Sequence, residues 1–263
     1  MRSSAEATEG VRSVRRRDFV AGVATGASPV LAGAIAYRKR HPIGSRTSYS
    51  QQGEDIVLYH VARDLLGIEH PTYVDVGAAD PIKGNNTYLM YGALGGHGVL
   101  VEPNPTFASA LRSERPRDTV VEAGIGVAET STADYYVIKG DPLHNTFSSD
   151  QVATLQRGKS ESVVERVVKM PLLDINQVIA EHLGEAPDVL STDVEGLDYA
   201  ILRRLDLTRF RPGCICAETA AMWNPEQNSD ITSYLLSVGY VVRGGSTVNT
   251  IYVDDRRLPH GQG

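Results

Sequence analysis

The sequence has few cysteines, no excess of positive charge and no repeats, and each of these absences excludes a class of protein. The two cysteines, Cys214 and Cys216, form no CxxC pair and have no histidine near them in the sequence, so we expect no zinc site. Two reduced thiols in one core strand suit a reducing compartment. The formal net charge is −6, so the chain lacks the electrostatic footprint of a nucleic-acid-binding protein. We find no internal repeat and no coiled-coil pattern.

What the sequence does contain is enough apolar material for one substantial core. Hydrophobic residues make up 41% of the 263 positions and charged residues 22%, as in a soluble globular protein. We expect an N-terminal extension over residues 1–47, one folded domain over residues 48–257 and a C-terminal tail over residues 258–263.

The N-terminal extension allows three interpretations. Residues 1–18 are polar and rich in arginine, residues 19–36 are uncharged and rich in small side chains, and a basic segment follows at residues 38–40. Arg16 and Arg17 resemble a twin-arginine export signal, with a small-residue cleavage site at residues 34–36. Alternatively, residues 19–36 form a short membrane anchor, or the extension has no sorting role.

Short apolar segments alternate with amphipathic ones through the rest of the chain, which predicts a largely parallel sheet covered by helices on both faces. We expect helices at residues 50–66, with Ser50 as N-cap, and at 85–94, 106–114, 174–183, 196–205 and 231–238. We expect strands at residues 72–76, 99–102, 119–122, 133–139, 163–170, 188–192 and 214–218. Residues 240–242 and 250–253 should pair as an antiparallel edge, and residues 140–160 should form a loop.

Acidic residues stand at the ends of the predicted strands. In an open α/β sheet these ends meet at one edge and bind ligands there. Gly77 follows the first strand and lets the backbone approach a ligand closely, while Glu102 ends the second strand, where a carboxylate can accept hydrogen bonds from a ribose diol. We therefore predict a nucleoside cofactor across these two strand ends. The alternative is that the carboxylates cap the helices that follow. The acidic residues at strand ends are Asp75, Glu102, Glu122, Asp193 and Glu218.

The loop after the first strand argues against a dinucleotide. The dinucleotide fingerprint is G-x-G-x-x-G, whereas here Gly77 is followed by Ala78, Ala79 and Asp80, and Asp80 would repel a phosphate. S-adenosylmethionine carries a ribose and an adenine but no phosphate, and acidic strand ends would favour its cationic sulfonium. An NAD-dependent sugar-modifying Rossmann enzyme remains the alternative.

Residues 48–253 resemble the FkbM family of S-adenosylmethionine-dependent methyltransferases. The resemblance is carried by residues 49–55, 74–78, 85–87, 101–105 and 193–196, together with Arg211, Pro212 and Glu218. It implies an α/β fold with a Rossmann-like seven-stranded methyltransferase sheet, mostly parallel with an antiparallel C-terminal edge and helices on both faces. It also implies O-methylation of a hydroxyl on a small molecule, a natural product or a saccharide.

The resemblance further implies roles for individual residues. Glu102 would hold the ribose, Asn86 and Thr87 would approach the methionine end, and Asp193 would lie near the sulfonium and the acceptor. Some similar enzymes hold a divalent metal with carboxylates, and Asp193 and Glu218 would suit magnesium. Two departures from the family pattern, Thr192 and the Leu197-Asp198 pair, leave the acceptor side open. The full set of expected cofactor-binding residues is Asp75, Gly77, Ala78, Asn86, Thr87, Glu102, Pro103, Asn104, Gly124, Ile125 and Asp193.

Methyl transfer to an alcohol also requires that the hydroxyl lose its proton. His144, in the expected loop, is our first candidate for the base, and Asp193 is the second.

Trp223 could stack on a sugar or simply pack. We expect the domain in the cytoplasm, where the methyl donor is made, with residues 19–36 as a membrane tether, and export as the alternative. A third hypothesis is a catalytically inactive methyltransferase-fold module. The acceptor and the oligomeric state stay open.

Overall fold

The structure is a computed structural model that describes residues 47–128, 130–194, 196–220 and 229–258. Its main sheet has seven strands in the order β3-β2-β1-β7-β8-β10-β9. β10 runs antiparallel to both of its neighbours, whereas the other pairs are parallel. The predicted parallel sheet with an antiparallel C-terminal edge is therefore confirmed. The strands are β1 (Thr72–Val76), β2 (His97–Val101), β3 (Thr119–Val121), β7 (Val189–Thr192), β8 (Cys214–Glu218), β9 (Tyr240–Gly245) and β10 (Asn249–Asp254).

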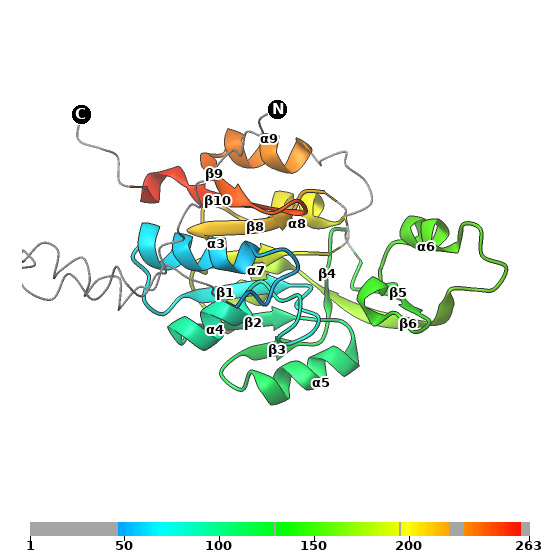
Figure 1. Cartoon of the computed structure of the whole chain (residues 1–263). Helices are drawn as coiled ribbons and strands as arrows, with labels where there is room; N and C mark the ends of the chain where they lie inside the picture. Colours follow the sequence, from blue (N-terminus) through cyan, green and yellow to red (C-terminus); the bar gives the residue numbers. More distant parts are fainter. Residues whose placement is uncertain (1–46, 129, 195, 221–228, 259–263) are drawn as a thin grey trace, which may run out of the picture. The chain divides into compact units, whose positions relative to one another are not determined.

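Helices cover both faces of this sheet (Figure 1). One face packs against α3 (Glu54–His60), α4 (Tyr88–Leu94) and α5 (Pro105–Glu114), and the other against α7 (Ile175–His182), α8 (Asp198–Arg204) and α9 (Ser229–Ser237). Side chains alternate between the two faces along each strand. In β1, Val74 and Val76 belong to the core under α7 and α8, while Tyr73 belongs to the core under α3 and α4. Asp75 therefore lies on the α3 and α4 side.

A second, smaller sheet carries an extension that we call the arm, residues 132–173. Its strands β5 (Thr132–Ile138) and β6 (Val164–Leu173) are antiparallel, and β6 also pairs in parallel with β4 (Gly124–Ile125). Between β5 and β6 lie the 3₁₀ turn η2 (Pro142–His144) and helix α6 (Ser149–Gln156). Figure 1 shows the arm standing away from the main sheet, to which β4 connects it.

Two expectations about local structure are wrong. Residues 140–160 are not all loop, because they contain η2 and α6. α6 buries no side chain, so it leaves no apolar periodicity in the sequence, and its first turn is held by Ser148, whose hydroxyl accepts from the Gln151 N–H at 3.2 Å.

The first helix also begins later than expected, at Glu54. Gly53, not Ser50, is its N-cap residue; the Ser50 hydroxyl, three positions earlier, accepts from the N–H groups of Gly53 and of Asp55 in the first turn of the helix. Gly53 has φ 93°, a left-handed conformation that separates this loop from the helix. The helix then continues as a π-helical turn, η1 (Val61–Leu65).

The C-terminal end of the domain closes with the 3₁₀ turn η3 (Asp255–Arg257), after which Leu258 is buried. Residues 19–36 and Trp223 lie outside the described residues, so the membrane anchor and the stacking of Trp223 on a sugar stay predictions. In the ranges that the structure does describe, no helix is long and apolar enough to cross a membrane.

Candidate functional site

The loop after β1 brings three strand ends together. Gly77 has φ 84°, and a Cβ atom there would lie 2.2 Å from the carbonyl oxygen of Asp193, which follows β7. Only glycine permits so close an approach. The N–H groups of Gly77 and Ala78 both donate to the carbonyl oxygen of Val101, the last residue of β2, at 2.9 and 3.3 Å. The carboxyl ends of β1, β2 and β7 thus form one edge.

Glu102 is the acidic residue at the centre of this edge. Its side chain is 4% exposed; Oε2 accepts from the N–H of Ala79 at 2.8 Å and Oε1 from the N–H of Asn104 at 2.6 Å. Ala79 has φ 49°, a left-handed conformation that costs a non-glycine residue roughly 1–2 kcal/mol and that this hydrogen bond helps to hold. The structure therefore places Glu102 beside the glycine loop at the strand end next to Asp75, as predicted.

Burial has an electrostatic consequence for Glu102. It raises the pKa of the carboxyl to about 7, although the N–H groups of Asn104 and Ala79 oppose the shift. Each carboxylate oxygen has further lone pairs, so hydroxyl donors on a ligand would stabilise the ionised form. Glu102 can thus act as an acceptor whose charge depends on what binds to it.

Asp75 is held in a buried polar network centred on Arg115, which sequence reasoning missed. The Thr87 hydroxyl donates to Asp75 Oδ2 at 2.7 Å. The Arg115 guanidinium is 0% exposed and donates to Asp118 at 2.7 Å. Arg115 also donates, at 3.0 Å in each case, to oxygens of Tyr73, Asn85 and Thr87.

The charges of this network are unbalanced. Burial alone would lower the pKa of Arg115, yet Tyr73, Asp118 and Asp75 raise it overall. Burial raises the pKa of Asp75, with Arg115 and Thr87 acting against the shift. Asp75 thus shares one buried cation with Asp118, which lies near the start of β2, where it accepts from the Gly98 N–H at 2.8 Å.

The loop before α4 is tied to the same network. The Asn85 side-chain amide donates to the carbonyl oxygen of Ala78 at 2.9 Å. Asn86 donates to the Ser191 hydroxyl at 3.3 Å, and its buried Oδ1 has no hydrogen-bond partner among the residues that the structure describes. An unsatisfied buried acceptor of this kind is suited to an N–H group on a ligand.

Other predicted residues are used differently. The Asn104 side chain caps α5 by accepting from the Thr106 N–H at 3.0 Å, and Pro103 precedes it. Gly124 and Ile125 form β4, but the Ile125 side chain lies in the core under α7 and α8. Asp193 follows β7, and its N–H donates to the carbonyl oxygen of Val76 at 3.1 Å.

The remaining candidates are not brought into this network. Glu218 ends β8, where it pairs with Asn249 of β10. His144 belongs to the arm, and its Nδ1 lies 2.8 Å from Asp141 Oδ2. Within the described ranges no group of three or more His, Cys, Asp or Glu side chains could hold a metal ion. The magnesium site at Asp193 and Glu218 therefore stays a prediction, and we derive no step through a metal.

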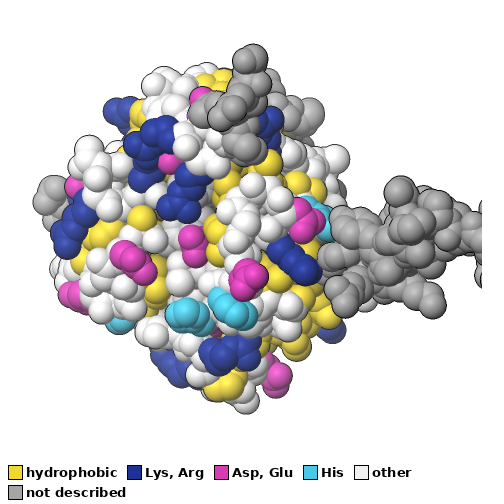
Figure 2. Space-filling model, turned by 90° about the vertical axis from the view of Figure 1, so that its left-hand side faces the viewer, with side chains coloured by type: hydrophobic (Ala, Val, Ile, Leu, Met, Phe, Trp, Pro, Cys, Tyr) yellow, Lys and Arg dark blue, Asp and Glu magenta, His cyan; other side chains and the backbone are white. Residues whose placement is uncertain are grey.

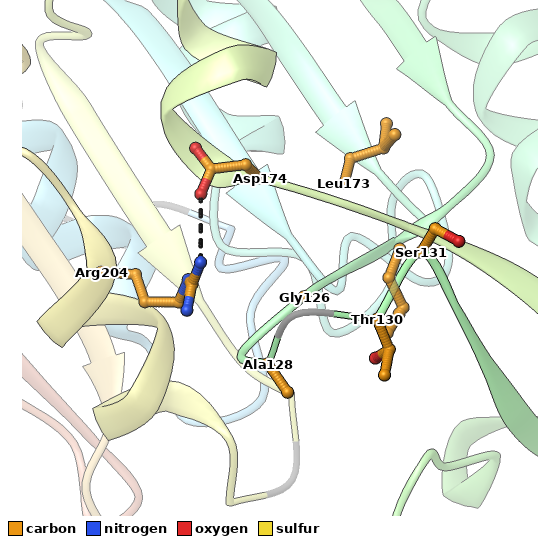
Figure 3. A pocket seen from close by; sticks show the side chains of 8 residues that line it. Gly126, Ala128, Thr130, Ser131, Leu173, Asp174 and Arg204 are labelled. Atoms are coloured by element: carbon orange, nitrogen blue, oxygen red, sulfur yellow. Dashed lines mark ion pairs between the residues drawn. The ribbon is translucent and has the colours of Figure 1, made fainter.

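A shallow pocket lies on another side of the molecule, at the base of the arm (Figure 3). Its volume is about 260 Å³, and Asp174 and Arg204, 3.8 Å apart, stand on its wall. Pockets that enclose drug-sized ligands measure roughly 300–1,000 Å³. Because Asp174 already caps α7, this pocket is a weaker candidate than the strand ends.

The face opposite the arm carries acidic and basic side chains interspersed, with no continuous stripe of one sign (Figure 2). A surface that binds nucleic acid through its phosphates usually gathers basic residues on one side. The expectation that nucleic acid is not a partner stays a prediction.

Replacing Arg115 with methionine should destabilise the fold by about 3–5 kcal/mol, because Asp118 and Asp75 would lose their buried cation. Urea unfolding of both proteins measures the difference. Arg112→Met, in the same helix but with an exposed side chain, is the matched control and should cost less than about 1 kcal/mol. Equal effects of the two substitutions would contradict the network.

Glu102→Gln should relieve a cost of charge burial that grows with pH. Burial raises the pKa of Glu102 to about 7, so the folded wild type favours the protonated carboxyl. The contribution of this group to the free energy of unfolding is fully present below its ordinary pKa and is lost as the pH rises through 7. Relative to the wild type, the variant should gain up to about 3 kcal/mol between pH 4.5 and pH 8. Urea unfolding across this range checks it, with the exposed Glu122→Gln as control, and a difference independent of pH would refute it.

Comparison with known proteins finds a family model and similar solved structures. Solved structures similar to the chain include an FkbM methyltransferase from Methylobacillus flagellatus KT, with 16% identity, a TM-score of 0.43, and coverage of 70% of this chain and 44% of that chain. Another is an O-methyltransferase from Bacillus cereus in complex with SAH, with 14% identity and a TM-score of 0.38; the match covers 90% of this chain and 96% of that chain. Fibrillarin from Aeropyrum pernix with natively bound S-adenosyl-L-methionine has 12% identity and a TM-score of 0.41; the match covers 75% of this chain and 71% of that chain.

These likenesses concern the fold alone, and the chain spans less than half of the Methylobacillus protein. No curated protein sequence matches the chain. The model of the methyltransferase FkbM domain, however, matches residues 75–242, well over half of the 263 residues. The chain therefore belongs to the FkbM family of S-adenosylmethionine-dependent methyltransferases and has their Rossmann-like fold.

Proposed function

We propose that this protein is an S-adenosylmethionine-dependent O-methyltransferase that acts on a hydroxyl of a small molecule, a natural product or a saccharide. The observation that carries the proposal is the placement of Glu102, a buried carboxylate held against the Gly77 loop with lone pairs still available for a ribose diol. Membership of the FkbM family supports methyl transfer as the reaction.

The hydrogen bonds of the loop favour a nucleoside without phosphates. Dinucleotide sites offer backbone N–H groups to a pyrophosphate. Here the N–H groups of Gly77, Ala78 and Ala79 already donate to Val101 and Glu102. Asp80, just after the loop, would repel a phosphate, and its carboxylate accepts from the N–H groups two and three residues further on. The NAD-dependent alternative therefore has no obvious phosphate site.

The acidic strand ends suit a cationic methyl donor. Bound S-adenosylmethionine supplies a methyl group on a positively charged sulfur, which an acceptor oxygen takes by in-line displacement. In our proposal Asp75 and Glu102 provide the negative field, while Asn86 Oδ1 accepts from the amino group of the methionine end. Holding donor and acceptor in line is worth several kcal/mol.

The acceptor hydroxyl must also lose a proton. His144 is the proposed base, because histidine is the commonest general base; its Nδ1 lies 2.8 Å from Asp141 Oδ2 without a hydrogen bond between them. Asp193 at the end of β7 is the second candidate. The proposal places the domain in the cytoplasm, where the donor is made, with residues 19–36 as its tether.

Cofactor use is tested by calorimetric titration with S-adenosylmethionine. The wild type should bind, and Glu102→Ala should weaken binding by at least about 150-fold, since two hydrogen bonds to a charged acceptor, each worth about 1.5–3 kcal/mol, are lost. Binding should also strengthen from pH 5.5 to pH 8, because Glu102 with its pKa of about 7 becomes ionised over this range. Glu122→Ala, an exposed carboxylate after the neighbouring strand, should bind like the wild type. A wild type that binds no S-adenosylmethionine would favour the inactive-module hypothesis.

The base is tested separately from cofactor binding. His144→Ala should lower kcat by about 10²- to 10⁴-fold, the usual contribution of a general base, without changing the affinity for S-adenosylmethionine. Release of S-adenosylhomocysteine with a panel of hydroxylated saccharides and small alcohols is the readout. Asp193→Asn is compared in parallel. An unchanged kcat for His144→Ala, with a reduced kcat for Asp193→Asn, would assign the base to Asp193.

A further inference from the structure

The edge that carries Glu102 is covered by side chains of the arm. Gly124, in β4, has no side chain, and the ring of Phe147 fills the space beside it. A Cβ atom built on Gly124 would lie 2.6 and 2.7 Å from the Cζ and Cε2 atoms of Phe147. The arm therefore packs directly on the segment that follows β3, next to Glu102 at the end of β2.

Tyr135 completes this cover. Its ring centroid lies 4.8 Å from that of Phe147, and its side chain is 5% exposed. Burial raises the pKa of the Tyr135 phenol, and the negative charge of Glu102 adds to the shift, so the phenol lies within electrostatic reach of that carboxylate. Two aromatic rings of the arm thus lie beside Gly124, and one of them is within electrostatic reach of the residue that we assign to the ribose.

The geometry of a nucleoside gives these rings a function. When the ribose diol is held at Glu102, the base and the 5′ substituent leave the ribose on opposite sides. The 5′ side of our proposed cofactor points to Asp75 in β1 and to Asn86, in the loop before α4, which donates to Ser191 of β7. The base must then lie on the other side of Glu102, toward β3, Gly124 and the arm.

We propose that Phe147 and Tyr135 form the aromatic wall of the base-binding site, with the adenine lying against Gly124 and stacking on the Phe147 ring. This inference rests on the proposed function. In this structure the Phe147 ring lies against Gly124, and Glu102 is buried. The ring therefore has to move off Gly124 when the base enters. It then stacks on the face of the base that is turned away from Gly124. The arm is accordingly part of the cofactor site.

The test is calorimetric titration with S-adenosylhomocysteine and, separately, with adenosine. Phe147→Ala and Tyr135→Ala should each weaken the binding of both ligands by about 5- to 150-fold, the range that stacking contacts with bases contribute. Phe147→Leu keeps an apolar side chain but has no aromatic face, and should also bind more weakly. It serves in place of Phe147→Ala if that variant does not fold, as judged by thermal unfolding.

Tyr136→Ala is the matched control. Tyr136 is the same residue type, one position further along β5, and its side chain points to the opposite face of the strand. It should bind both ligands like the wild type. If Tyr136→Ala weakens binding as much as Phe147→Ala, the arm acts only through its own fold and the inference is overturned.

The remaining outcomes separate the inference from the proposed function. A wild type that does not bind S-adenosylhomocysteine removes the proposed function and the inference with it. A wild type that binds, with Phe147 and Tyr135 variants of unchanged affinity, removes the inference and leaves the proposed function intact. Loss of S-adenosylhomocysteine binding with unchanged adenosine binding would place the rings at the other end of the cofactor, which also overturns the inference.

Discussion

The buried guanidinium of Arg115 is the interaction on which the site depends. Among the residues that the structure describes, no other Lys or Arg is buried. It is hydrogen-bonded to Asp118, which also accepts from the Gly98 N–H in β2, and to Asn85 and Thr87 in the loop before α4. One cation thus joins β1, β2, α5 and that loop. Because an unpaired buried charge costs several kcal/mol, these elements keep their relative positions.

The same network prepares the strand ends for a particular kind of ligand. Asp75 and Asp118 share one cation, and Glu102, at the end of the neighbouring strand β2, has no cation among its hydrogen-bond partners. The backbone N–H groups that a phosphate would need are already used inside the protein. What this edge still offers is oxygen acceptors, at Glu102 and at Asn86 Oδ1. Such an edge favours a ligand that carries hydrogen-bond donors and a positive charge. This preference is the physical basis for proposing S-adenosylmethionine as the cofactor.

The arm adds the apolar element that the strand ends lack. Carboxylates alone would hold a ribose but would give a purine ring nothing to stack on. Phe147 and Tyr135 supply aromatic faces there, and they do so from a segment attached to the domain through β4 and β6. Gly124 and Gly77 have similar roles, because the absence of a side chain lets another group come close. At Gly124 this group is the ring of Phe147, and at Gly77 it is the backbone carbonyl of Asp193.

The sequence by itself determined the sheet and the strand ends at which its acidic residues stand. The strand at residues 72–76 and the strand at residues 214–218 were predicted to the residue, because buried parallel strands are short apolar runs whose ends are marked by glycine or acid. It also placed Asp75 and Glu102 on adjacent strands. Only the tertiary structure decided that Arg115 is buried, that α6 forms without an apolar face, and that Phe147 covers Gly124. Periodicity reports the average environment of an element, whereas these features depend on single contacts between residues far apart in the chain.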